Sequence, residues 1–162
     1  MIDPIALIEL TNLKASGQLE TLAAHPQLGI KPGWIVELAT DKDWYVRINL
    51  ADNPAIANFP EIPEKLSQDK HPYVRRQLSR NSILANFPEI VEKLSTDEDW
   101  LVRYNLAENP AISAFLEIIQ QLSTDEDPNV REALAKNPAI PTRTARTNSW
   151  QTTQPVTQAP AI

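Results

Sequence analysis

The chain has 162 residues, 42% of them hydrophobic, with a net charge of −6 and no cysteine. The acidic balance argues against a nucleic-acid-binding protein, because phosphate binding needs clustered Lys and Arg. The lack of cysteine excludes disulfides, thiolate catalysis and sites in which cysteine binds zinc or an iron–sulfur cluster.

The N-terminal stretch, MIDPIALIELTNLKASG, does not have the pattern of a signal peptide. It lacks a basic start, and Glu9 and Asn12 interrupt its apolar residues. No apolar run in the chain reaches the ~20 residues that a membrane-spanning helix needs. We therefore expect a cytoplasmic protein that does not cross a membrane.

Four segments recur at a constant interval of 28 residues and align without a gap. They read DKDWYVRINLADNPAI (41–56), DKHPYVRRQLSRNSIL (69–84), DEDWLVRYNLAENPAI (97–112) and DEDPNVREALAKNPAI (125–140). A second block, such as IVEKLSTD (90–97), precedes each of them. Self-similarity of this kind is typical of repeat proteins, in which each unit packs on its neighbours.

The repeat divides the chain into three parts. Residues 1–28 are predicted to form a degenerate capping repeat, because Leu10 and Leu22 are in phase with the later units while LKASGQLE breaks the pattern. Residues 29–141 hold four repeats. Residues 142–162 are rich in Thr, Gln and Pro, so we expect them to be mostly disordered.

Each repeat is predicted to contain two short helices. The first opens near a proline such as Pro60 and buries Ile62 and Leu66, one turn apart. In the second, Val46 and Leu50 face the core, and the helix ends before Pro54 because proline disfavours helical geometry in the preceding residue. The N-cap position of the second helix is occupied by Asp43, His71, Asp99 and Asp127.

The predicted fold class is therefore all-α. We expect a short right-handed α-solenoid of helix pairs with about four clear units and a degenerate N-terminal cap. A leucine-rich repeat has a compatible length, but it needs a strand written L-x-x-L-x-L, which no unit supplies.

The motif D-x-D-W-x-V-R-x-x-L-A-x-N-P, followed by a helix ending in L-S/A-x-D, resembles the leucine-rich repeat variant family, a relative of HEAT-like solenoids. The resemblance covers about residues 30–141. It implies a binding or scaffolding role, and a helix of the 59–66 type that is partly 3₁₀. Some members bind an iron–sulfur cluster through N-terminal cysteines, which this chain lacks. The unit is also slightly longer than the family's, in the connection NPAIANFP.

Three polar columns are the same in all four repeats, and we interpret them as a structural ladder. A residue that is the same in every unit is expected to have a role that every unit shares, and that role is stacking on the neighbouring unit. The Asp and Arg columns are expected to pair within and between units, and the Asn column to bond helix-end or neighbouring backbone carbonyls. The alternative is a charged ladder that binds a ligand. The columns are Asp41, Asp69, Asp97 and Asp125; Arg47, Arg75, Arg103 and Arg131; and Asn53, Asn81, Asn109 and Asn137.

The variable positions of the second helix are the candidates for partner binding, because recognition residues face a different part of the ligand in each unit. At about 100° per residue these positions lie opposite Val46. They place aromatic, apolar and Arg side chains on one face, which resemble binding anchors. The alternative is an ordinary mixed surface. The candidates are Tyr45, Ile48, Tyr73, Arg76, Leu101 and Tyr104.

Other residues point to packing or capping, and none to catalysis. Trp44 and Trp100 are expected to pack on the preceding turn. The histidines, His25 and His71, lie in the Asn column and at an N-cap, so neither has the setting of a metal ligand or catalytic base. The acidic run 97–99 lacks the glycine of an EF-hand loop. We predict no catalytic residue, no metal site and no cofactor.

The sequence therefore predicts an interaction scaffold that binds a protein or peptide on the face of the second helices. One alternative is an accessory or structural domain of a larger polypeptide. The other is a HEAT-like enzyme subunit, which would need a basic groove or paired catalytic groups that we do not find.

Overall fold

A computed structural model describes residues 12–13, 17–25 and 32–141 of the chain. These residues form helices and the connections between them, with no strand among them, which confirms the all-α class. The predictions for Leu10, for most of the capping repeat and for the segment 142–162 lie outside the described residues. Within them, no helix is long and apolar enough to cross a membrane.

The described elements follow a regular order along the chain. They are α2 (Leu19–Ala23), α3 (Pro32–Leu38), α4 (Trp44–Asp52), η2 (Pro54–Asn58), α5 (Glu61–Ser67), α6 (Pro72–Arg80), η3 (Ser82–Asn86), α7 (Pro88–Ser95), α8 (Trp100–Glu108), η4 (Pro110–Ala114), α9 (Leu116–Ser123) and α10 (Pro128–Lys136), where η denotes a 3₁₀ helix.

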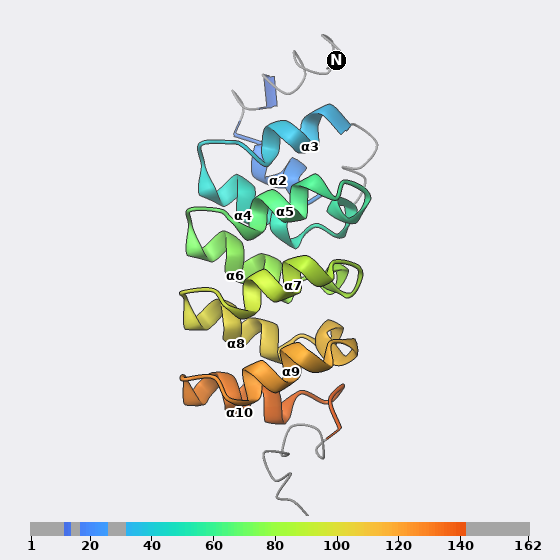
Figure 1. The fold of residues 1–162 in the computed structure, drawn as a ribbon. Helices are drawn as coiled ribbons and strands as arrows, with labels where there is room; N and C mark the ends of the chain where they lie inside the picture. Colours follow the sequence, from blue (N-terminus) through green and yellow to red (C-terminus); the bar gives the residue numbers. More distant parts are fainter. Residues whose placement is uncertain (1–11, 14–16, 26–31, 142–162) are drawn as a thin grey trace, which may run out of the picture.

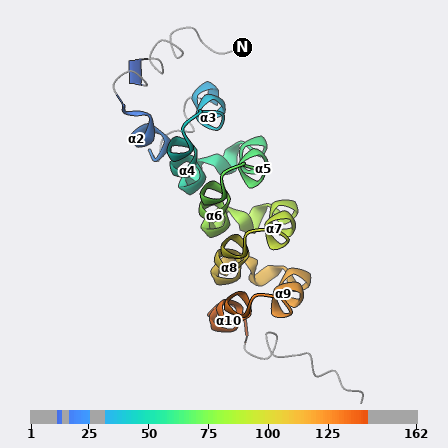
Figure 2. The same cartoon turned by 90° about the vertical axis from the view of Figure 1, so that its left-hand side faces the viewer.

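The helices lie in two layers that run the length of an elongated stack (Figures 1 and 2). One layer contains α4, α6, α8 and α10, and the other contains α5, α7 and α9. Each helix packs on the next one in its layer. The contacts in the first layer are more extensive than those among α5, α7 and α9. The second layer is therefore the more open one.

The second helix of each unit begins where the N-cap residues predict. The side chain of Asp43 accepts a hydrogen bond from the backbone N–H of Tyr45 (2.9 Å), and Asp99 and Asp127 do the same in their own units. This bond satisfies a donor that the first turn leaves unpaired. His71 occupies the same position without a side-chain cap, and there Pro72 supplies the preset helical φ.

All four second helices are followed by Asn, whereas only three of these asparagines are followed by proline. Helix α6 ends at Arg80, although Ser82 replaces proline after Asn81. The backbone of Asn81 is extended (φ −69°, ψ 131°), and its side-chain oxygen accepts from the N–H of Ile83 at 3.1 Å. The asparagine side chain thus starts the following 3₁₀ helix.

The 3₁₀ segments do not lie where the family resemblance places them. They span Pro54–Asn58, Ser82–Asn86 and Pro110–Ala114, whereas Glu61–Ser67 is an α-helix. The expectation of a partly 3₁₀ helix at 59–66 is therefore wrong. The physical reason lies in the connection, where the N–H of Phe59 bonds to the carbonyl of Ile56 three residues back (3.0 Å) and closes the tighter turn.

The core is a single cluster of buried side chains between the two layers. The predicted inward residues Val46, Leu50, Ile62 and Leu66 are all buried, as are their counterparts in the next units. Leu22 of the capping segment is only partly buried against this cluster. The predicted helical spacing therefore identifies the core residues correctly.

Truncating an interior core residue should cost more than truncating one at the N-terminal end. Leu78→Ala and Leu106→Ala each remove a fully buried side chain and should lower the free energy of unfolding by ~2–5 kcal/mol. Leu22→Ala should cost clearly less, because its side chain is only partly buried. Urea denaturation measures all three, and equal losses would contradict this view of the core.

Candidate binding surface

Each interior arginine of the ladder joins its own unit to the next. The Nε and Nη2 of Arg47 donate to the two carboxylate oxygens of Asp69, at 2.6 and 2.9 Å, while its Nη1 donates to the carbonyl of Asp41 at 2.6 Å. Arg75 pairs with Asp97 in the same way, and Arg103 with Asp125. These guanidinium and carboxylate groups are nearly buried. Bidentate pairs of this kind are strong and directional.

The aspartate in each pair has a second partner in its own unit. An oxygen of Asp69 accepts from the backbone N–H of His71 (2.9 Å), and Asp125 does the same for Asp127. Burial raises the pKa of Asp69, but the hydrogen bond from Arg47, the backbone bond and the positive charges outweigh it, so the pKa lies below its usual value. The pKa of Asp125 is lowered for the same reasons.

Arg131 is the exception in the arginine column. Its Nη1 donates to the backbone carbonyls of Asp125 and Glu126, and its side chain is exposed. It forms no ion pair within the described part of the chain. The column therefore contains three buried arginines that bridge units and one exposed arginine that does not. The exposed one, Arg131, can serve as a control when the bridging arginines are mutated.

The asparagine column forms a second set of bonds between units. The side-chain amide of Asn109 donates to the carbonyls of Ser79 and Asn81, at 2.9 and 3.1 Å, where the preceding second helix ends. Asn53, Asn81 and Asn137 each donate to carbonyls at the same place in the preceding unit. Asn53 reaches Ala23 and His25, so the segment containing α2 is held like a unit. Each amide satisfies carbonyls that the helix end leaves unpaired.

Four of the six candidate binding residues line one hollow on the face formed by α4, α6 and α8. This hollow has a volume of about 250 Å³, and Gln77, Arg80 and Asn105 complete its lining. The four candidates are Ile48, Tyr73, Arg76 and Leu101. The other two lie elsewhere: Tyr45 is exposed beside Trp44, and Tyr104 packs at the edge of Trp100 and donates to Glu108 at 2.8 Å.

Arg76 has a partner that the sequence analysis did not assign to it. Its Nε donates to Asp99 of the next unit at 2.6 Å, and its guanidinium lies 4.8 Å from the centre of the Tyr73 ring. The pair is partly exposed. Arg76 is thus held in place by a bridge between units as well as being part of the hollow.

A cluster of rings lies beside the hollow. Trp44 stacks on His71 of the next unit, with ring centres 4.4 Å apart and planes 4° from parallel, and Tyr73 lies 5.8 Å from Trp44. Trp44 is 37% exposed and Tyr73 48%. The ring of Trp44 thus finds a flat partner across the repeat boundary, a contact that the expectation of packing on its preceding turn does not include.

The six candidates predicted from the sequence do not include His71, Gln77, Arg80 and Asn105, which contribute to this face. Gln77, Arg80 and Asn105 each follow a candidate residue by four positions, so helical spacing was a signal for them. The ring pair of Trp44 and His71 depends on the distance between units, which no local pattern gives. In the described residues no group of His, Cys, Asp and Glu is arranged to hold a metal ion.

No protein-family model matches the chain, and no curated protein or solved structure matches it either. The resemblance to the leucine-rich repeat variant family therefore stays a prediction from the sequence.

Removing a bridging arginine should destabilise the protein far more than removing the exposed one. Arg103→Ala leaves the nearly buried carboxylate of Asp125 without its cation and should cost about 1–3 kcal/mol. Arg131→Ala should cost less than about 0.5 kcal/mol, as is usual for exposed positions. Thermal and urea unfolding of the two variants measure the difference, and similar losses would show that the bridge contributes little.

The lowered pKa values of Asp69 and Asp125 predict a loss of stability in acid. A carboxyl group with a lowered pKa in the folded state stabilises it above the unfolded value of about 3.9, and this stabilisation disappears as the pH falls through the folded-state pKa. The free energy of unfolding should therefore fall steeply below about pH 4.

Asp69→Asn should make this acid dependence shallower. Glu132→Gln is the matched control, because the exposed Glu132 pairs with Lys136 in its own helix and solvent screens that pair. Urea unfolding between pH 2.5 and 7 measures both variants. An unchanged slope in Asp69→Asn would contradict the assignment.

Proposed function

We propose that the chain is a short right-handed α-solenoid of 28-residue helix pairs, and that it serves as an interaction scaffold. Its partner is a protein or peptide that binds on the face of α4, α6 and α8. The observation that carries this proposal is the hollow whose walls come from three successive units through Ile48, Tyr73 and Leu101.

The division of labour between columns supports the proposal. The Arg and Asn columns are nearly all buried and engaged in bonds between units, so they have little capacity left for a ligand. The six candidate residues occupy positions that vary between units, and their side chains are exposed or half-buried on the outer face of the same helices. Variation at exposed positions on a regular framework is how repeat proteins present different contacts to one extended partner.

The chemistry of the face suits an apolar or aromatic anchor on the partner. Ile48 and Leu101 offer aliphatic walls, and Tyr73 offers a half-exposed ring. Arg80 is exposed and forms no ion pair within the described residues, so its guanidinium is available to a carboxylate or carbonyl at the rim. Aromatic residues and arginine in such a setting are the usual energetic centres of protein interfaces.

The test is affinity capture with quantitative mass spectrometry on variants inside and outside the proposed face. Leu101→Ser and Tyr73→Ala alter the proposed face, whereas Val36→Ser alters an exposed apolar residue on α3, outside the hollow. A partner should be retained by the wild type and by Val36→Ser and lost by the other two variants. Circular dichroism must show that all variants remain folded.

A titration with that partner should then show weakening by ~1 kcal/mol or more, which is about fivefold, for Tyr73→Ala. If the same proteins bind equally to all the variants, the proposed face is not the binding face.

A further inference from the structure

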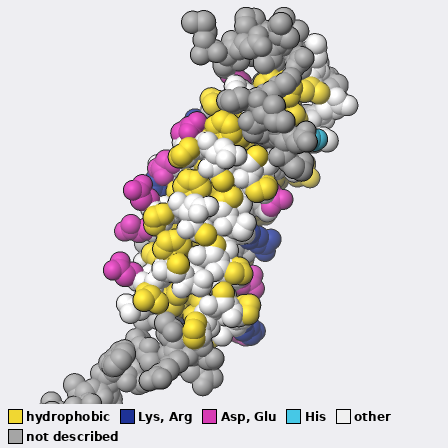
Figure 3. Space-filling view, turned by 90° about the vertical axis from the view of Figure 1, so that its right-hand side faces the viewer, with side chains coloured by type: hydrophobic (Ala, Val, Ile, Leu, Met, Phe, Trp, Pro, Cys, Tyr) yellow, Lys and Arg dark blue, Asp and Glu magenta, His cyan; other side chains and the backbone are white. Residues whose placement is uncertain are grey.

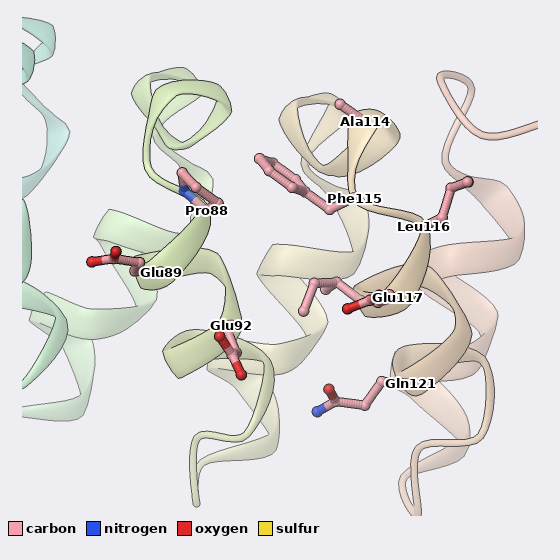
Figure 4. Close-up of a pocket in the computed structure, with 9 residues that line it drawn as sticks. Pro88, Glu89, Glu92, Ala114, Phe115, Leu116, Glu117 and Gln121 are labelled. Carbon is pink, nitrogen blue, oxygen red and sulfur yellow. The ribbon is translucent and has the colours of Figure 1, made fainter.

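A second hollow lies between α7 and α9, in the layer opposite the face proposed above. It has a volume of about 490 Å³. Pro88, Phe115 and Ile118 form its apolar part, and Glu92, Glu117 and Gln121 its polar part. In Figure 4 the ring of Phe115 points across the gap towards Pro88, while the side chains of Glu92, Glu117 and Gln121 extend between the two helices.

The neighbouring gap, between α5 and α7, offers a direct comparison. There Lys93 on α7 reaches back across the gap, and its Nζ lies 2.5 Å from the carboxylate of Glu64 on α5. The cation of one unit thus covers the acid of the preceding unit. Both side chains stay partly exposed, so this contact across the gap lies at the surface.

In the gap between α7 and α9, one repeat later, the acidic residue is present but the lysine is not. Glu92 occupies the position of Glu64, but Gln121 occupies the position of Lys93. The amide of Gln121 donates to the backbone carbonyl of Ser95 at 3.1 Å and carries no charge. Within the described part of the chain, Glu92 and Glu117 have no ion pair. The gap between α7 and α9 therefore keeps its carboxylates without the cation that its neighbour supplies.

The surroundings add to this charge imbalance. Figure 3 shows the side of the molecule that carries the 3₁₀ helices, where hydrophobic side chains run along the middle and acidic ones gather along the left-hand edge. Phe115 is only partly buried, and Leu116, which follows it, is 60% exposed. An apolar surface thus lies beside carboxylates that lack a cation.

We propose that this gap is a second binding site, which takes a partner peptide carrying Lys or Arg next to an apolar residue. The cation pairs with Glu92 and Glu117 in the way that Lys93 pairs with Glu64, and the apolar side chain packs on Phe115 and Pro88. The charge and shape of the gap support this occupant, since its rim is acidic and its wall apolar. The site is separate from the face of α4, α6 and α8 and does not depend on binding there.

The chain itself suggests the variant that tests this site. Gln121→Lys recreates the arrangement of the preceding gap and supplies an internal cation to Glu92. Glu92→Gln removes the acid instead. Ala135→Lys is the matched control, because it adds the same charge at an exposed position on α10. Circular dichroism establishes that each variant is folded.

The probe is a fluorescein-labelled peptide of sequence Gly-Lys-Leu-Lys-Gly, followed by fluorescence anisotropy on the full chain. The wild type and Ala135→Lys should bind it with the same affinity to within about twofold, because a remote charge is screened at about 0.1 M salt. Gln121→Lys and Glu92→Gln should each bind about tenfold more weakly, as expected when a charge-assisted hydrogen bond is lost. Replacing the peptide's leucine by serine should weaken binding about fivefold.

Several results would overturn the proposal. One is that the wild type does not bind the peptide at all. Another is equal binding by Gln121→Lys and the wild type, or equal affinity for the serine peptide, which would indicate only general attraction to an acidic protein. A third is a dimer, seen by sedimentation equilibrium, that Gln121→Lys dissociates, which would assign the gap to a second copy of the chain.

Discussion

The structure depends on one interaction, the bidentate hydrogen bond between an arginine of one unit and the aspartate of the next. The arginine also binds a carbonyl of its own unit, and the aspartate also binds a backbone N–H of its own unit. Each pair therefore holds the second helix of one unit against the residues that lead into the second helix of the next unit. Because both charged groups are nearly buried, they are stable only when the units stack in register. Short helices of this length depend on such contacts, since they are marginal in isolation.

This dependence explains why the two layers differ. The Arg pairs and the Asn bonds both join the second helices, at their beginnings and at their ends, and those helices pack closely. The first helices are joined by side chains that vary, such as Lys93 with Glu64 and Gln121 with the Ser95 carbonyl. Because the second helices hold the stack together, the side chains between the first helices can differ from unit to unit. The first proposed site lies at positions that vary from unit to unit. The second combines recurring residues, Phe115 and Glu117, with Gln121, which stands where the preceding unit has Lys93.

Sequence reasoning identified the contacts that recur in every unit and missed the contacts that occur in only one place. The recurring Asp, Arg and Asn columns were expected to make contacts within and between units, and the helical spacing of Val46 and Leu50 identified the core. The stack of Trp44 on His71 and the pair of Arg76 with Asp99 join residues 27 and 23 positions apart, each in a single copy. Only the distance between units decides such contacts. The 3₁₀ segments were misplaced because their position depends on the asparagine side chain that follows the helix, not on hydrophobic spacing.

The most direct test of the account is a double-mutant cycle on Arg75 and Asp97, the central pair of the stack. The two alanine variants and the double variant are compared with the wild type by urea unfolding. We expect a coupling energy of about 1–3 kcal/mol, because each group is nearly buried and has the other as its main charged partner. A coupling energy near zero would mean that the units stack without this bond, and would contradict its central role in the fold.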